Sequence, residues 1–391
     1  MISFDKAFET VMASSFRMGT EEVPFTAAAG RVLATEILSD IDMPPFNKAT
    51  VDGFACRMED VEKELAVIET IPAGRLPEKS IRKGECSRIM TGAPVPDGAD
   101  CIIMVEDTVL LPSGFVKFTG VNTKANISFR GEDIKKGDAV LHSGKLLSPQ
   151  DIAVLASVGS VSATVSIRPI IGIISTGDEL VEPQYVPAMS QIRNSNAWQL
   201  IAQSEKTGCE SKYYGIARDD EAETFSIVNK AVSECDILLL TGGVSMGDFD
   251  FVPSVLERAG VKILFSRVRV QPGKPTTFGI HEKCLVFGLP GNPVSSFIQF
   301  ELLVRPLVYR MMGHEWKPMS LDLVIDDNYR RRSSDRLGFV PVRITSKGKV
   351  KIIDYHGSAH INSMSMADAV MSVPEGRSEI RKGEIVHVRQ I

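Results

Sequence analysis

Between residues 167 and 312, short apolar runs alternate with longer amphipathic stretches, and this alternation restricts the fold more than any other feature. Short apolar runs bounded by turn residues are typical of strands buried on both faces. Strands that alternate with helices predict a mostly parallel sheet covered by helices on both sides. The predicted strands are residues 169–175, 211–217, 236–242, 262–268 and 284–289, and the predicted helices are residues 196–207, 221–234, 251–259 and 292–312.

The remaining sequence predicts further domains, because a chain of 391 residues exceeds one typical core. Residues 1–42 and 148–158 have helical periodicity, whereas 65–145 reads as short strands between Gly and Pro turns. Residues 316–391 alternate apolar and polar side chains, as a small all-β unit does. The predicted class is therefore an α/β multidomain protein: a doubly wound, mostly parallel sheet domain (167–315), a β-rich inserted domain (44–137), a helical linker domain (1–43 plus 138–166) and a small C-terminal β-barrel-like domain (316–391).

Charge and apolar patterning exclude several classes of partner. The formal net charge of −5 argues against non-specific binding to nucleic acid or to an anionic membrane surface. The basic run "NYRRRSSDR" at 328–336 is interpreted as a solvated face. The amphipathic N-terminus does not resemble a signal peptide, and no apolar run is long enough to span a bilayer. We therefore expect a cytoplasmic protein without nucleic-acid or membrane partners.

Ligands of open parallel sheets bind outside the carboxyl ends of the strands, so the segments after the predicted strands are the candidate site. Every such segment carries glycine, hydroxyl, acidic or basic side chains, which chance would not favour at one edge. They are "STGDEL" (175–180), "ARDDEAE" (217–223), "TGGVSMGDFD" (241–250), "RVQPGKPTT" (269–277) and "GLPGNPVSS" (288–296).

The third segment indicates a phosphorylated ligand with a hard cation. Gly242 and Gly243 permit a sharp turn and close backbone approach, and the following N–H groups with Ser245 can face an anion. Asp248 and Asp250 would repel a bare phosphate, and a divalent cation such as Mg²⁺ between them is the simplest accommodation.

Two other segments supply helix N–H groups and positive charge. Pro293 stands in the first turn of a predicted helix, which leaves free N–H groups around it. Lys274 provides positive charge, with Arg267 and Arg269 upstream of it. The segment "PGKP" is not a P-loop, because the pattern G-x-x-x-x-G-K-[ST] is absent.

Each piece also has a purely structural explanation. A Gly-Gly pair after a strand is commonly only a turn. Asp219 and Asp220 could cap the helix 221–234, and Asp178 and Glu179 could be solvated loop acids. It is their coincidence at one sheet edge that favours a binding site.

Eight segments occur in an order that resembles the MoeA family of molybdopterin molybdenumtransferases, which is related to gephyrin and the plant molybdenum insertases. The resemblance covers essentially the whole chain, and the shared order makes it specific. Five of these segments follow the predicted strands: "STGDEL", "ARDD", "TGGVSMGDFD", "QPGKPTTFG" (271–279) and "GLPGNPVSS". The other three lie in the first half of the chain: "VDGFA" (51–55), "RIMTGAPVP" (88–96) and "RGEDI" (130–134).

The resemblance implies an elongated four-domain homodimer in which the linker domain takes part in dimerisation and the α/β domain binds molybdopterin. The implied activity is insertion of molybdate into adenylylated molybdopterin, with Mg²⁺ as cofactor, which releases AMP and molybdenum cofactor. The implied partner proteins are the molybdopterin adenylyltransferase and apo-molybdoenzymes. Two alternatives remain open: adenylylation of molybdopterin, and a non-catalytic molybdopterin-binding scaffold.

Site residues can be transferred only where this chain matches the family's motifs. In the family, the insert completes the cleft of the partner subunit, so the matching insert residues imply a shared site. The implied catalytic residues are Asp52, Thr91 and Asp133 in the insert, and Glu179, Asp219 and Asp250 in the α/β domain. Asp219 and Asp250 are also the implied metal ligands. The predicted substrate-binding residues are Gly243, Ser245, Arg267, Lys274, Pro290, Asn292, Pro293 and Ser358.

Two positions depart from the family's pattern. Members often have Lys where this chain has Gln271, which removes one positive charge that Arg267 or Arg269 could replace. Some members have Arg where this chain has Pro341, although Arg343 lies nearby. Both departures concern the contact with molybdate or phosphate.

Overall fold

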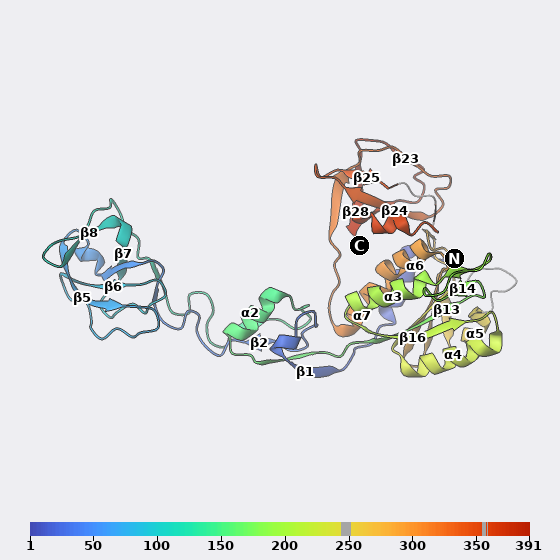
Figure 1. Cartoon of the computed structure of the whole chain (residues 1–391), viewed down its shortest axis with the longest axis horizontal. Helices are drawn as coiled ribbons and strands as arrows, with labels where there is room; N and C mark the ends of the chain where they lie inside the picture. Colours follow the sequence, from blue (N-terminus) through green and yellow to red (C-terminus); the bar gives the residue numbers. More distant parts are fainter. Residues whose placement is uncertain (244–251, 354–356, 358) are drawn as a thin grey trace.

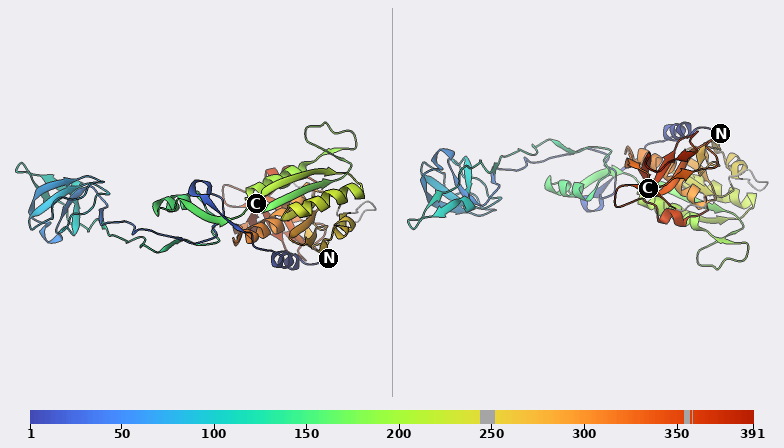
Figure 2. Two further views of the ribbon diagram at one scale, coloured as in Figure 1. Left: turned by 90° about the horizontal axis from the view of Figure 1, so that it is seen from below. Right: turned by 90° about the horizontal axis from the view of Figure 1, so that it is seen from above.

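The fold is described from a computed structural model that covers residues 1–243, 252–353, 357 and 359–391. The chain is elongated: the β-rich insert occupies one end, and the α/β and C-terminal domains lie together at the other (Figure 1). The views of Figure 2 show the same separation from two further sides. Within the described residues, no helix combines the length and the apolar character needed to cross a bilayer.

The α/β domain contains a six-stranded sheet with the order β16-β13-β17-β21-β20-β18. Neighbours among β16, β13, β17 and β21 pair in parallel, whereas β20 is antiparallel to both β21 and β18. The predicted strands therefore all run in the same direction. Strand β20 was not predicted from the sequence; it follows the 271–275 loop directly, without a helix between. The bounds are β13 (Ile170–Thr176), β14 (Leu180–Val181), β15 (Ile192–Arg193), β16 (Glu210–Ala217), β17 (Ile237–Thr241), β18 (Lys262–Phe265), β20 (Thr277–His281) and β21 (Cys284–Leu289).

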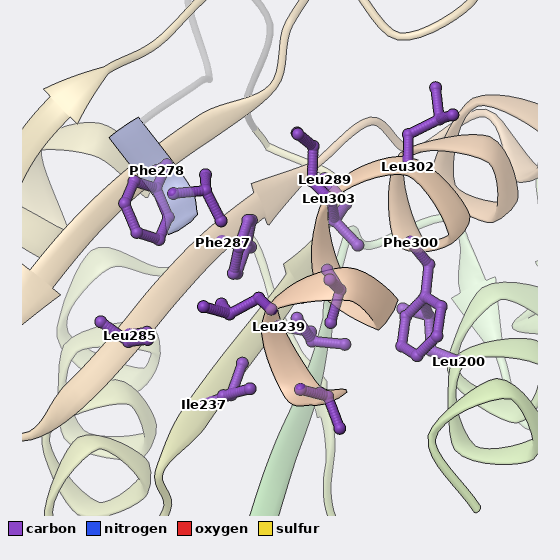
Figure 3. Packing of buried hydrophobic residues seen from close by; sticks show 14 of the residues in the cluster. Leu200, Ile237, Leu239, Phe278, Leu285, Phe287, Leu289, Phe300, Leu302 and Leu303 are labelled. Atoms are coloured by element: carbon purple, nitrogen blue, oxygen red, sulfur yellow. The ribbon is translucent and has the colours of Figure 1, made fainter. Parts of the chain in front are cut away.

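Helices cover both faces of this sheet, as Figure 1 shows. Successive strand side chains point to opposite faces, so Ile237 and Leu239 pack in one core and Leu238 and Leu240 in the other. Figure 3 shows the first core, where Leu239 lies beside Phe287. The first face carries α1 (Phe4–Ala13), α3 (Ser195–Lys206), α6 (Pro293–Gln299) and α7 (Arg305–Met312), and the second carries α4 (Glu221–Glu234) and α5 (Val252–Arg258).

A π-helical turn, η4 (Phe300–Val304), joins α6 to α7 within the predicted helix 292–312. The buried Glu301 carboxylate accepts hydrogen bonds from Arg305 at 2.7 Å and Gln203 at 2.6 Å. A buried charge is tolerated only when it is paired in this way.

The linker region is less helical than expected. Residues Ala7, Val11 and Met12 of α1 pack into the α/β core. The prediction of helix beyond α1 up to residue 42 is wrong, because the segment after it pairs with distant strands and forms little helix. The elements are β1 (Thr20–Pro24) paired with β12 (Ser162–Ser166), β2 (Ile37–Leu38) paired with β11 (Ala139–Leu141), the 3-10 turn η1 (Phe25–Ala27) and α2 (Pro149–Ser157).

The insert is built on a six-stranded sheet with the order β7-β4-β6-β5-β9-β8. Two connecting segments lead to it, and the Asp42 carboxylate ties them together by accepting from Arg130 Nε at 2.7 Å and from the Lys136 N–H at 2.9 Å. The bounds are β3 (Lys48–Ala49) paired with β10 (Ile127–Ser128), β4 (Gly53–Cys56), β5 (Glu64–Ile71), β6 (Glu85–Ile89), β7 (Cys101–Met104), β8 (Thr108–Leu110) and β9 (Phe115–Phe118), with 3-10 turns η2 (Met58–Asp60) and η3 (Val105–Asp107).

The C-terminal sheet extends across the domain boundary. Strand β19 (Val270–Gln271), from the α/β domain, pairs in parallel with β24. An isolated bridge between Ile325 and Val350 brings the end of β22 back to β25, so the sheet curls towards closure. The bounds are β22 (Ser320–Val324), β23 (Tyr329–Arg330), β24 (Leu337–Ile344), β25 (Val350–Ile352), α8 (Asn362–Ser365), β26 (Ala369–Val373), β27 (Glu379–Ile380) and β28 (Ile385–Gln390).

We expect Leu239→Ala to lower the free energy of unfolding of the α/β domain by about 2–5 kcal/mol, because Leu239 is fully buried and its removal leaves a cavity. Trp198 and Trp316 both lie in or against this domain, so urea unfolding followed by tryptophan fluorescence measures the effect. Leu76→Ala, at an 80% exposed position in the insert, is the control. Equal midpoints for the two variants would contradict this packing.

Candidate functional site

The carboxyl ends of β13, β17 and β21 surround a cavity of about 340 Å³, here called the strand-end cavity. The first residues of α3 and α6 also line it, as do Ala359 and Ile361 of the C-terminal domain. The structure therefore has a cavity at the sheet edge where the sequence predicts a binding site. Its polar lining includes Thr176, Glu179, Arg193, Asn196, Thr241 and Asn292.

Glycine is required at the turn after β17. Gly242 has φ +96°, and a Cβ atom there would lie 2.4 Å from the Thr176 carbonyl oxygen. Asn196 fixes the neighbouring turn, because its Nδ2 donates to Thr241 Oγ1 and to the Gly291 carbonyl, each at 2.8 Å. The ends of two strands are therefore held against each other at short range.

Two helix N-termini face this cavity. The Asn194 carboxamide caps α3 by accepting from the Ala197 N–H at 3.3 Å, and it also accepts from Ser175 Oγ at 3.0 Å. Asn292 and Pro293 open α6 at the same cavity. Unpaired N–H groups and the helix dipole make such ends favourable for anions.

A second cavity of about 350 Å³, here called the interdomain cavity, lies between residues 271–275 and the C-terminal domain. Its lining includes Gln271, Lys274 and Arg336. Asn292 lines both cavities, so the turn at 290–293 stands between them. The Arg336 side chain is 23% exposed, and Asp335 lies 3.6 Å from its Nε.

The departures from the family's pattern can now be placed. Gln271 lines the interdomain cavity, but Arg267 is not among the residues that line the described cavities. Arg269 forms an ion pair with Glu375 at 3.6 Å. Arg343 reaches the Met366 carbonyl at 3.5 Å. The positive charge at the interdomain cavity is therefore supplied by Lys274 and two arginines from the C-terminal domain.

Of those two arginines, Arg331 has a structural role. Its guanidinium donates to three backbone carbonyls, those of Pro374, Arg336 and Arg377, at 2.7–2.8 Å. The basic run 328–336 is thus partly buried rather than wholly solvated. Arg336 is the arginine that remains for a ligand.

The acidic residues that follow β13 and β16 have different surroundings. Asp219 and Asp220 are both exposed, and Asp220 caps α4 by accepting from the Glu223 N–H at 2.7 Å. The Asp219 N–H donates to Asp178 Oδ1 at 3.2 Å, so a hydrogen bond joins the segments that follow β13 and β16. Glu179 lines the strand-end cavity.

Carboxylate oxygens are the ligands that Mg²⁺ prefers, and the acids of Asp178 and Asp219 supply that chemistry. No group of three or more His, Cys, Asp or Glu residues converges within the described ranges. Asp248 and Asp250 lie outside the described residues, as do Ser245 and Ser358. A complete magnesium site therefore stays a prediction.

The insert holds the other implied catalytic residues. Asp52 Oδ1 accepts from the Thr91 N–H at 2.6 Å and from Thr91 Oγ1 at 3.0 Å. Asp133 lies on a connecting segment, where its N–H donates to the Met43 carbonyl at 3.0 Å. Within one chain, β6, which precedes Thr91, is remote from β13 of the α/β domain (Figure 1).

Sequence reasoning missed Arg193, Asn196 and Arg336 as cavity residues. Asn196 stands at the start of a predicted helix, and a polar residue in that first turn was the available signal. Arg193 precedes that helix on a strand too short to be read from periodicity. Arg336 depends on contact between domains, for which the sequence carries no local signal.

The structure thus defines a multidomain protein. A doubly wound domain has a glycine turn and two helix N-termini at its strand ends, a β-domain covers a cavity lined by Lys and Arg side chains, and a β-insert lies at the far end of the chain. Residues 2–159 match the MoeA N-terminal region (domain I and II), and residues 327–391 match the MoeA C-terminal region (domain IV). Residues 172–310 match a probable molybdopterin binding domain.

Relatives extend this match over the full length. The molybdopterin molybdenumtransferase of Staphylococcus epidermidis is 34% identical, over 99% of this chain and 95% of the relative. That of Staphylococcus aureus is 32% identical over the same shares. The crystal structure of the molybdopterin biosynthesis moeA protein from Pyrococcus horikoshii OT3 aligns with a TM-score of 0.86 at 32% identity, over 100% of both chains. The chain belongs to the MoeA family.

We expect Gly242→Ala to destabilise the α/β domain more than Gly215→Ala does. Both positions have positive φ, which costs a residue with a Cβ roughly 1–3 kcal/mol. Only at Gly242 would the Cβ also meet the Thr176 carbonyl, since nothing lies within 4 Å of a Cβ at Gly215. Urea midpoints from tryptophan fluorescence make the comparison, and a larger effect at Gly215 would contradict the proposed turn geometry.

The Thr91 N–H, followed by the Thr91 hydroxyl, holds the pKa of Asp52 below its ordinary value of 3.8. Because the folded pKa is lowered, this contribution to stability is present above pH 3.8 and is lost as pH falls through the lowered pKa. We expect Thr91→Val to raise the Asp52 pKa part of the way, since the backbone N–H remains. Carboxyl ¹³C NMR titration measures it, with Thr91→Ser as the conservative control; an unchanged pKa in Thr91→Val would show that the hydroxyl has no part.

Proposed function

We propose that this protein, an enzyme of molybdenum cofactor biosynthesis, inserts molybdate into adenylylated molybdopterin and releases AMP and molybdenum cofactor. The observation that carries the proposal is the pair of cavities on either side of the 290–293 turn, with Asn292 in the wall of both. A reaction between two anions needs two adjacent anion sites, and relatives of this chain are named molybdopterin molybdenumtransferases.

The strand-end cavity is assigned to adenylylated molybdopterin. Its glycine turn at Gly242 allows a phosphate to approach the backbone closely, and the N-termini of α3 and α6 favour negative charge. Glu179 supplies a hydrogen-bond acceptor for the N–H groups of a pterin or purine ring. Gly243 and Ser245 remain proposed phosphate contacts, the latter outside the described residues.

The interdomain cavity is assigned to molybdate. Lys274 and Arg336 bring two positive charges to a concave site that Pro290 and Asn292 separate from the strand ends. A tetrahedral dianion requires such a local concentration of positive charge in a protein of net charge −5. The uncharged Gln271 leaves more of the binding to Lys274 and Arg336 than a lysine at that position would.

In the proposed reaction, a molybdate oxygen attacks the phosphorus of the molybdopterin phosphate, and the bond from that phosphorus to AMP breaks. The two dithiolene sulfurs then form bonds to molybdenum as two molybdenum–oxygen bonds break; one oxygen stays on the molybdopterin phosphate and the other leaves as water. The chain's own contribution is to hold the two anions on opposite sides of the 290–293 turn, which replaces random encounter by a fixed approach. Mg²⁺, when bound, would offset charge on the pyrophosphate as AMP leaves. Asp219 and Asp250 are its proposed ligands, the latter outside the described residues.

A homodimer is part of the proposal. The Asp52–Thr91 pair and Asp133 lie on the insert and its connection. The insert is separated from the α/β domain of its own chain (Figure 2). A partner subunit could bring them to the strand-end cavity, which would make dimerisation a condition of activity. The adenylyltransferase and apo-molybdoenzymes are the proposed donor and acceptor proteins, in the cytoplasm.

The test is AMP release from adenylylated molybdopterin by the purified protein with Mg²⁺, with and without molybdate. The product is then assayed for activation of a cofactor-free molybdoenzyme. Molybdate-dependent AMP release with an activating product supports the proposal. Tight binding without release would favour a scaffold, and formation of adenylylated molybdopterin from ATP would favour the adenylyltransferase alternative.

We expect Lys274→Gln to raise the KM for molybdate about 10- to 100-fold, because a charge-assisted hydrogen bond contributes about 1.5–3 kcal/mol. Gln271→Lys should lower that KM, since it adds a positive charge to the same cavity. Lys347→Gln, an exposed lysine outside the cavity lining, is the charge-matched control. A KM unchanged in Lys274→Gln would remove molybdate from the interdomain cavity.

A further inference from the structure

The strand-end cavity has little positive charge in its lining. Among the described residues that line it, Arg193 is the only Lys or Arg, and it faces a site that otherwise offers neutral polar groups and Glu179. A phosphorylated ligand in this cavity would meet helix N-termini and this one guanidinium. A role for Arg193 in binding requires that its side chain be held in place.

The segment 182–194, which carries Arg193, is held against the sheet by hydrogen bonds at both of its ends. Glu182, at its start, accepts from the Tyr213 hydroxyl at 2.6 Å and from Trp198 Nε1 at 3.4 Å. Tyr213 in turn accepts from Asn194 Nδ2 at 2.8 Å, directly after Arg193. Burial, followed by the Glu182 carboxylate, raises the pKa of Tyr213, so the hydroxyl keeps its proton and continues to donate. Both ends of the segment are therefore joined to β16 through one tyrosine.

Arg193 is held within this segment while its terminal nitrogens stay available. Its Nε donates to the Tyr185 carbonyl at 3.1 Å, which fixes the direction of the side chain. No Asp or Glu in the described part of the chain forms an ion pair with it. Strand β15 also pairs with β14, which follows the end of β13. Among the described residues, the exposed guanidinium is thus tethered through Nε, and its two terminal nitrogens, which can bind a pair of oxygens, have no partner.

We propose that Arg193 binds a phosphate group of the ligand in the strand-end cavity, with Glu182 and Tyr213 as positioning residues. The planar guanidinium matches two oxygens of a phosphate, and the adjacent N-terminus of α3 favours the same charge. The identity of the ligand rests on the proposed function, whereas the phosphate contact rests on this geometry. Tyr213→Phe would release the segment without removing the charge.

The first test compares binding of AMP and of adenosine by calorimetry to wild type, Arg193→Gln and Arg193→Lys. We expect Arg193→Gln to weaken AMP binding about 10-fold or more and to leave adenosine binding unchanged, because only AMP carries the phosphate. Arg193→Lys should retain part of the affinity, since the charge remains without the paired donors. Arg330→Gln, an exposed arginine on β23, is the control. AMP binding by Arg193→Gln equal to wild type, or equal losses for AMP and adenosine, would overturn the proposal.

The positioning role is tested by a double-mutant cycle. Tyr213→Phe keeps the ring beside Trp198 and loses only the hydroxyl. If Tyr213 acts through Arg193, Tyr213→Phe weakens AMP binding in wild type but adds little in the Arg193→Gln background. Fully additive losses would show that Tyr213 acts independently. Failure of molybdate-dependent AMP release in wild type would refute the proposed function, while these binding results would still decide the role of Arg193.

Discussion

The parallel register of β13, β16, β17 and β21 is the constraint on which the rest depends. Parallel pairing brings the carboxyl ends of these strands to one edge, so short polar segments from distant parts of the sequence meet there. Buried side chains that alternate between two cores maintain that register, because a slip of one residue would exchange the faces. The glycine turn at Gly242 and the Asn196 hydrogen bonds then shape the edge into a cavity.

The C-terminal domain acts on this edge through a shared sheet. Strand β19 contains Gln271 and pairs with β24, so the cationic loop and the domain that closes over it belong to one hydrogen-bonded unit. Arg389 adds a second tie, since it donates to the Glu301 carbonyl at 2.7 Å. Backbone pairing between the two domains therefore fixes the geometry of the interdomain cavity.

Much of the α/β fold and the position of its strand-end cavity could be predicted from local sequence patterns. Apolar runs located the parallel strands, and glycine, asparagine and acidic residues after them located the edge. The prediction was wrong where pairing partners lie far apart: residues 20–24 form β1 because 162–166 are opposite them. Arg193 and Arg336 were missed because their proximity to a cavity depends on a short braced segment and on a domain contact. Asp220 proved to be a cap, which its position alone had left open.

The central claim is that two anions occupy separate cavities on either side of the 290–293 turn. Anomalous scattering from tungstate in crystals that also contain AMP tests it most directly, because tungsten is located without reference to the rest of the density. The account predicts the tungsten beside Lys274 and Arg336, with the AMP phosphate beside Arg193 across Asn292. Tungsten in the strand-end cavity, or AMP between Lys274 and Arg336, would contradict it.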